Sequence, residues 1–148
     1  MRVYLDACCL NRPFDDQSQE RIRLEAEAVI LILNRVERKD LEWVGSEILD
    51  FELTQAPDAD RVIRVSVLAR FAHKKIRIDQ AVEKRAWELG KLGFDAYDAL
   101  HLACAEKGGV EVFLTTDDRL VRLAHRLSGV LRTSVKNPLI WLSEVREP

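Results

Sequence analysis

The stretch "GFDAYDALHLACAEKGGVEVFLTTDDRL", Gly93–Leu120, combines a helix, a break, a strand and the start of another helix. Ala and Leu occupy two sides of the first helix, which is typical of a helix that is buried on both faces. A pair of glycines then interrupts the chain, and "VEVFLTT" is the clearest strand in the sequence. Helices that alternate with a strand predict a parallel sheet covered on both faces, which is the α/β class.

The same alternation continues through the rest of the chain. Four further short runs predict strands, "RVYL", "LEWVG", "KIRI" and "VLRTSV". Helical patterns lie between them, the longest from about residue 19 to residue 38. The chain, residues 1–148, is predicted to form a single domain that is ordered except for the last few residues of "SEVREP".

Two features argue against export and membrane insertion. The N-terminus "MRVYLDACCLNRP" has an acid at Asp6, too early for a signal peptide, and "AVILILNRV" is apolar over six residues only. We therefore predict a cytoplasmic protein without a membrane span. Its cysteines, Cys8, Cys9 and Cys104, lack the spacing of a zinc site. We interpret them as buried structural thiols, with a catalytic cysteine as the alternative.

Charge gives two open interpretations. The net charge of −2 does not by itself indicate a polyanionic partner. Locally, however, residues 61–77 carry cations without one acid, and Arg119, Arg122 and Arg126 recur on one stripe of a predicted helix. Each group is either a solvated face or a contact surface for nucleic acid.

Acidic residues follow the predicted strands. Asp6 ends the first strand, and Asp117 follows the fourth. Asp98 begins the helix before the fourth strand, and Glu52 lies on the helix that Ser46 is expected to cap. In an open parallel sheet, ligands bind beyond the carboxyl ends of the strands, where the strand order reverses. If the first strand is that point, four carboxylates converge there, with no Lys or His among them.

Such a cluster requires cations, because like charges a few ångströms apart repel and raise one another's pKa. Ligation by carboxylates alone suits Mg²⁺ or Mn²⁺ and does not suit zinc. One or two such ions can activate water and neutralise charge on a phosphodiester. The sequence therefore predicts a nuclease site.

Other polar residues near these positions have simpler explanations. Asp95 is expected to cap the helix that carries Asp98, and a carboxylate in the first turn of a helix is favourable even without a functional role. His101 is interpreted as a packed or capping histidine. Three acids compete with the chosen ones, Glu47 and Asp50 with Glu52, and Asp118 with Asp117.

Taken together, these segments resemble the PIN domain family, whose members include Mg²⁺-dependent ribonucleases and the toxins of VapC-like toxin–antitoxin pairs. "YLDAC" resembles its first strand and acid, and "SEILDFEL" its second acid. "DAYDALHLACAE" resembles the helix of the third acid, and "LTTDDRL" the T-x-D segment that contains Thr115 and Asp117. The resemblance covers nearly the whole chain.

The resemblance implies a five-stranded parallel sheet of order 3-2-1-4-5 between two layers of helices. It also implies that Asp6, Glu52, Asp98 and Asp117 bind Mg²⁺ or Mn²⁺ and catalyse hydrolysis of single-stranded RNA, with Thr115 supporting the ligands. An antitoxin and a homodimer are its expected partners. Arg119 is expected to contact RNA at the entrance to the acids. Asn11 and Arg12 are expected to contact the phosphate backbone, with a turn before Pro13 as the alternative explanation. The chain departs from many relatives at Ala7 and Cys8, where they have Thr or Ser.

Two alternatives remain at this stage. A receiver domain of a response regulator has the same alternation, and Asp79, Thr115 and Lys136 could take the positions of its functional residues. It would leave Glu52 and Asp98 unexplained. The second alternative is a PIN domain that binds RNA or protein without cleaving it.

Overall fold

Five short parallel strands form one sheet in the order β3-β2-β1-β4-β5 in the computed structural model, which describes residues 1–145. This confirms the predicted class and strand order; the predicted disorder falls on residues 146–148, outside the described part. In chain order the elements are β1 (Arg2–Leu5), α1 (Ala7–Asn11), η1 (Arg12–Phe14), α2 (Glu20–Glu37), β2 (Glu42–Ser46), α3 (Glu47–Leu53), α4 (Ala59–Ala69), β3 (Lys74–Ile76), α5 (Gln80–Lys91), α6 (Ala96–Lys107), β4 (Val112–Leu114), α7 (Asp118–Arg126), β5 (Ser134–Lys136) and α8 (Pro138–Glu144).

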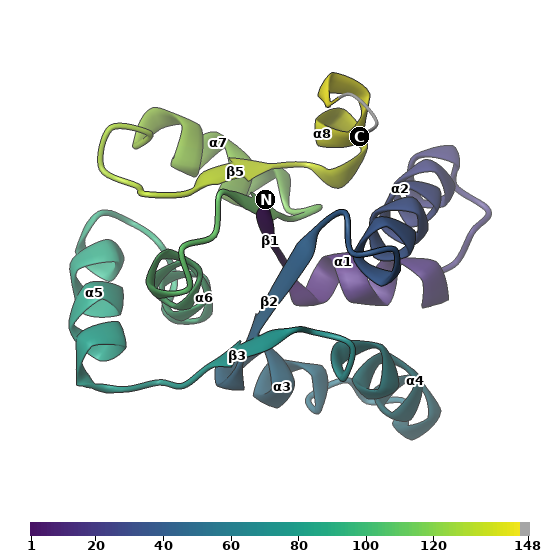
Figure 1. Ribbon diagram of the computed structural model, residues 1–148, viewed down its shortest axis with the longest axis horizontal. Coiled ribbons are helices and arrows are strands. Elements are labelled where there is room, and N and C mark those ends of the chain that lie inside the picture. The colour runs from purple at the N-terminus through teal and green to yellow at the C-terminus, as the bar shows by residue number, and fades with distance from the viewer. Residues whose placement is uncertain (146–148) are drawn as a thin grey trace.

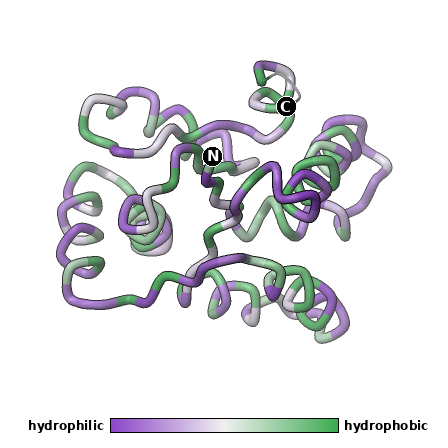
Figure 2. Tube along the Cα trace, in the orientation of Figure 1, coloured by the Kyte–Doolittle hydropathy of each residue, from purple (hydrophilic) through white to green (hydrophobic). Residues whose placement is uncertain are grey.

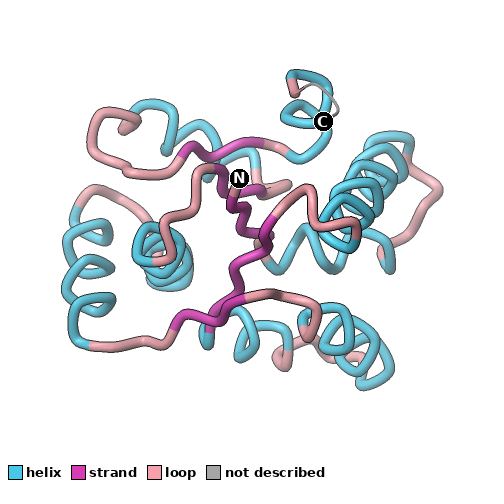
Figure 3. Tube along the Cα trace, in the orientation of Figure 1, coloured by secondary structure: helices cyan, strands magenta, loops and turns pink. Residues whose placement is uncertain are grey.

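The strands form a central layer with helices on either side (Figure 3). Helices α5 and α6 lie on one side of it, and α1 and α2 on the other (Figure 1). Crossovers between parallel strands are right-handed. The chain therefore places its helices on one side while it moves outward from β1 to β3, and on the opposite side once it returns to β4.

Burial follows the predicted patterns. Along α2 and α5, each turn carries both hydrophobic and hydrophilic residues, as expected of helices with one buried side (Figure 2). Helix α6 is more deeply buried, since most of its residues from Ala99 to Ala105 are inaccessible to solvent. No helix among residues 1–145 combines the length and the apolar composition that crossing a bilayer requires.

Helix caps fix the local geometry. As predicted, Ser46 caps α3 and Asp95 caps α6 with a side-chain oxygen that accepts a backbone N–H. Asp79 caps α5 in the same way. Helix α1 was not predicted, because it is only five residues long and follows Asp6 directly. Asp6 is its cap, so the first predicted metal ligand also starts a helix.

Candidate functional site

Asp6 is held at the point where two central strands end. Its backbone N–H donates to the carbonyl of Leu114 at 3.0 Å, which extends the pairing of β1 with β4 by one residue. One carboxylate oxygen accepts from the N–H of Ala7 at 2.8 Å, and the other accepts from the hydroxyl of Thr115 at 3.0 Å. The side chain is therefore oriented from two sides while only 6% of the residue is exposed.

His101 lies next to two of the acids, Glu52 and Asp6. Its Nε2 forms a hydrogen bond with Glu52 and lies 3.8 Å from Asp6. Its Nδ1 lies 2.6 Å from the hydroxyl of Tyr4, which in turn lies 2.6 Å from the hydroxyl of Ser46. Asp6, Glu52 and His101 each present a potential ligand atom within 4.8 Å of the others. The prediction of a cluster without histidine is thus wrong; the spacing of three residues between Asp98 and His101 was the available signal.

Asp98 and Asp117 lie outside this tight group but interact with it electrostatically. Burial, followed by the charges of Asp95, Asp6 and Asp117, raises the pKa of Asp98 to about 7. Asp117 is exposed, and one of its oxygens caps α7 by accepting from the N–H of Arg119 at 3.0 Å. Of the four acids predicted from sequence, Asp6 and Glu52 thus belong to the tight group, whereas the contact of Asp98 with it is electrostatic.

Histidine partly offsets the negative charge in this region. Burial raises the pKa of Asp6, the charge of His101 opposes that rise, and Glu52 adds to it. For His101, burial alone would lower the pKa, but the hydrogen bond to Glu52 and the charge of Asp6 outweigh burial and raise it. One imidazolium cannot neutralise all the carboxylates, so the arrangement still favours an additional cation.

The three competing acids form ion pairs outside the acidic cluster. Glu47 is paired with Arg77, Asp50 with Lys75 and Asp118 with Arg21. Glu47 also accepts from the backbone N–H of Ile78. These pairs leave Glu52 and Asp117 as the acids of their segments that interact with the central cluster.

The cysteines are of two kinds. All three are free; Cys9 and Cys104 are buried, as predicted. Cys8 is only half-buried, and its Sγ lies 3.3 Å from the hydroxyl of Thr115 and 3.6 Å from a carboxylate oxygen of Asp6. Its interpretation as a buried structural thiol is therefore wrong. The thiol contacts the same side chains that hold the first acid in place.

The predicted RNA contacts differ in availability. Asn11 donates to a carbonyl of its own helix, and Arg12 is paired with Asp15 and Glu25 while only 20% of its side chain is exposed. Arg119 is exposed. Binding of RNA by these residues stays a prediction, and the existing ion pairs make Arg12 the least available of them.

The basic segment is largely paired with acids. Its ion pairs are Arg61 with Asp15, Arg64 with Asp60, Lys75 with Asp50 and Arg77 with Glu47. This pairing favours a solvated face over a surface for a polyanion.

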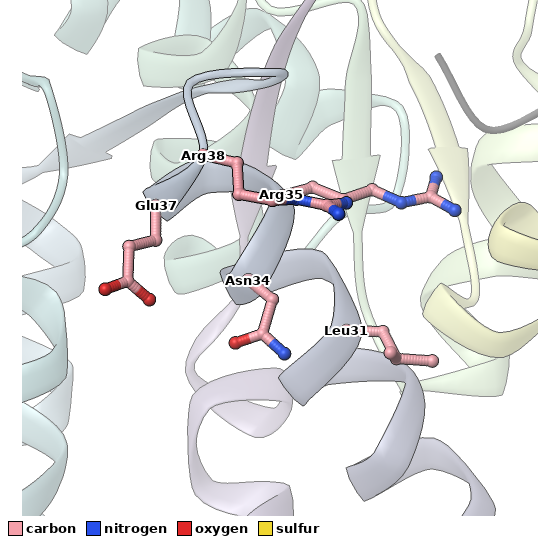
Figure 4. A pocket seen from close by; sticks show the side chains of 5 residues that line it. All are labelled: Leu31, Asn34, Arg35, Glu37 and Arg38. Carbon is pink, nitrogen blue, oxygen red and sulfur yellow. The ribbon is translucent and has the colours of Figure 1, made fainter.

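A pocket of about 380 Å³ lies along the last turns of α2, away from the acids (Figure 4). The residues that line it are Leu31, Asn34, Arg35, Glu37 and Arg38. None of them belongs to the acidic cluster, so this pocket does not mark the candidate site.

Fold and site together define an α/β domain whose acidic centre lies at the carboxyl ends of its middle strands. Two solved structures share the fold: VapBC-1 from nontypeable Haemophilus influenzae (13% identity, TM-score 0.61) and VapBC2 from Rickettsia felis bound to a DNA fragment from their promoter (10%, 0.57). Each match covers 93% of this chain and 98% of the other. No curated protein matches in sequence. The model of the PIN domain matches residues 3–126, so the chain belongs to the PIN domain family, whose members are generally nucleases.

The receiver alternative is wrong. Receivers have the strand order 2-1-3-4-5, whereas here β3 lies at the edge of the sheet. Asp79 follows that edge strand, caps α5 and is paired with Lys107. It is thus separated from Thr115 by the two strands between β3 and β4.

Proposed function

We propose that this protein is a metal-dependent ribonuclease of the VapC-like toxin class, which hydrolyses phosphodiester bonds in single-stranded RNA. The observation that carries the proposal is the group of Asp6, Glu52 and His101, whose potential ligand atoms lie within 4.8 Å of one another. Burial and the charges of Asp95, Asp6 and Asp117 also raise the pKa of Asp98 to about 7. Perturbation of this kind is frequent at catalytic sites. The proposed metal ligands are Asp6, Glu52, Asp98 and Asp117.

The chemistry of these side chains fits a hard divalent cation. Carboxylate oxygens are the ligands that Mg²⁺ and Mn²⁺ prefer, and the buried Asp6 is already oriented by Thr115. When bound, the cation would activate water and stabilise negative charge on the phosphodiester. The protein itself contributes orientation: Thr115 fixes Asp6, and His101 fixes Glu52 through its hydrogen bond.

Cleavage of a labelled single-stranded RNA in Mg²⁺ or Mn²⁺ tests this proposal. Asp98→Asn should reduce kcat/KM by about 100-fold or more, because the loss of one ligand removes several kcal/mol of charge stabilisation. Asp118→Asn is the matched control; Asp118 is paired with Arg21 and should tolerate the change. EDTA should abolish activity, and added Mn²⁺ should restore it. Metal-independent cleavage, or equal activity in the two variants, would contradict the assignment. RNA binding without cleavage would favour the non-catalytic alternative.

We further propose an antitoxin as partner, since both structural neighbours are described as VapBC. An apolar groove of about 660 Å³ between α2 and α4 suits one of its segments. Phe71, 66% exposed, and Ile30, 47% exposed, line this groove, and Lys39 and Arg70 also line it. A segment with an apolar face and flanking acids would complement both features. A homodimer, which the family resemblance implies, and a cytoplasmic location, which the N-terminal sequence and the short apolar run indicate, stay predictions.

Co-expression with the protein encoded by the neighbouring reading frame tests the groove. Phe71→Asp should weaken the purified complex by about 30-fold or more, because burying an exposed aromatic ring is a typical source of binding energy. Trp87→Asp is the control, since Trp87 is similarly exposed but lies on α5, outside the groove. Equal affinities for the two variants would place the partner elsewhere.

A further inference from the structure

Two aromatic rings remain exposed beside the acidic cluster. Phe51 of α3 and Tyr97 of α6 lie with ring centroids 6.4 Å apart and ring planes inclined by 23°. Despite this contact, Phe51 is 52% and Tyr97 is 42% exposed. Apolar surface that stays in water gains no free energy of burial, so a pair that served only packing is expected to be covered. These rings instead present free surface at the rim of the candidate site.

The position of the pair links it to the acids. Phe51 directly precedes Glu52 in α3, and Tyr97 directly precedes Asp98 in α6. Tyr97 also lies four residues, about 6 Å along the helix axis, before His101 and therefore on the same face of α6. His101 binds Glu52 across the gap between the two helices, and Tyr97 contacts Phe51 across the same gap. Two contacts therefore join α3 and α6: the exposed one is between the rings of Phe51 and Tyr97, and the more buried one is between Glu52 and His101 of the acidic cluster.

We infer that Phe51 and Tyr97 form a stacking platform for an unpaired base of RNA, in a nucleotide next to the phosphate held at the acids. This inference rests on the proposed function, because the acids are what would hold the phosphate. Aromatic rings bind unpaired bases by stacking, and every base offers a flat face for it. Bases in a duplex are covered by their neighbours, so the platform selects single strands. Stacking reads no hydrogen-bond pattern, so it positions the strand with little preference for sequence.

The test measures binding of a short single-stranded RNA by fluorescence anisotropy, with Ca²⁺ in place of Mg²⁺ to limit cleavage. Phe51→Ala and Tyr97→Ala should each raise Kd by about 5- to 150-fold, the range that corresponds to the loss of one base stack. Tyr97→Phe keeps the ring and should bind as the unsubstituted protein does. Trp87→Ala is the matched control, because Trp87 is 63% exposed but lies on α5.

A second measurement tests whether the ring of Tyr97 and one base of the RNA interact directly. A series of RNAs is prepared, each with one abasic nucleotide at a different position. At one of these positions the missing base should weaken binding to the unsubstituted protein. With that RNA, Tyr97→Ala should change the affinity little further. In Mg²⁺, the alanine variants should raise KM by a similar factor with little change in kcat, since stacking binds substrate and transition state alike. A general loss of folded protein would lower the apparent kcat and would not raise KM alone.

Two results would overturn the inference. One is unchanged RNA affinity in both alanine variants; if these variants also change from dimer to monomer, the rings join two copies of the chain. The other is an unsubstituted protein that does not bind the RNA. Failure of the proposed function differs from both: the protein would not cleave RNA in Mg²⁺, while its RNA affinity would still depend on the two rings.

Discussion

Without metal at about pH 8, Asp98→Asn should unfold at a higher temperature than the unsubstituted protein, although the same change is expected to reduce kcat/KM for cleavage by about 100-fold or more. Burial and nearby acids raise the pKa of Asp98 to about 7, so its charged form is disfavoured in the folded state. A shift of this size corresponds to about 4 kcal/mol at full burial, which solvent screening of a half-exposed carboxyl reduces to about 2 kcal/mol. Loss of the favourable interaction with the start of α6 offsets up to about 1 kcal/mol. The net gain in the melting temperature should be about 3 °C or more.

The sign of this effect depends on pH. Below about pH 4, Asp98 is protonated in both the folded and the unfolded chain, so it imposes no cost. As pH rises toward 7, the unfolded chain releases the proton while the folded chain retains it, and the folded state loses stability relative to the unfolded state. The advantage of Asp98→Asn should therefore be largest above about pH 7 and should shrink as the pH falls toward 4. Melting curves over this range measure it.

Metal should reverse the order of the two proteins. A ligand that binds only the folded state stabilises it by about 2.7 kcal/mol at a hundredfold excess over its Kd. Mn²⁺ should therefore raise the melting temperature of the unsubstituted protein more than that of Asp98→Asn, which lacks one ligand. Asp118→Asn should respond to Mn²⁺ as the unsubstituted protein does. If Asp98→Asn melts lower in EDTA and gains as much from Mn²⁺, Asp98 acts only as a favourable acid at the start of a helix.

Glu25→Ala should cost about 3 kcal/mol of folding free energy, because it leaves the buried Asn137 and the half-buried Arg12 without this carboxylate as acceptor. Glu25 is 1% exposed. Arg12 binds one oxygen at 2.9 Å, and Arg21 and Asn137 bind the other at 3.3 and 2.6 Å. The carboxylate thus connects α2 with the segment after α1 and with the start of α8. Such a loss would be a large part of the total stability of a domain of this size.

Urea denaturation measures this cost, provided that the slope of the transition is unchanged. Glu27→Ala, on the exposed side of the same helix, should change stability by no more than about 0.5 kcal/mol. Equal losses in the two variants would mean that the network around Glu25 stabilises the fold no more than the exposed surface does.

The elements and the acidic edge could be predicted from the sequence because their signals are local. Ser46, Asp79 and Asp95 each satisfy the backbone N–H three residues later, so the cap and its helix are visible in one short segment. Alternation of strands and helices restricts the chain to a parallel sheet, and a parallel sheet brings the residues after its strands to one edge. Asp6 and Asp117 could therefore be assigned to the same edge without coordinates.

The tertiary structure alone decided which side chains surround these acids. His101 lies 97 residues from Tyr4 and 49 from Glu52 along the chain, and Glu25 lies 112 residues from Asn137. No local pattern records such pairs, because each partner alone also fits a packed or a solvated position. They meet only because the crossovers place α3 and α6 beside the end of β1, and α8 beside α2. Once buried there, each polar group must find a partner, since leaving it unpaired away from water costs more free energy than the contact itself contributes.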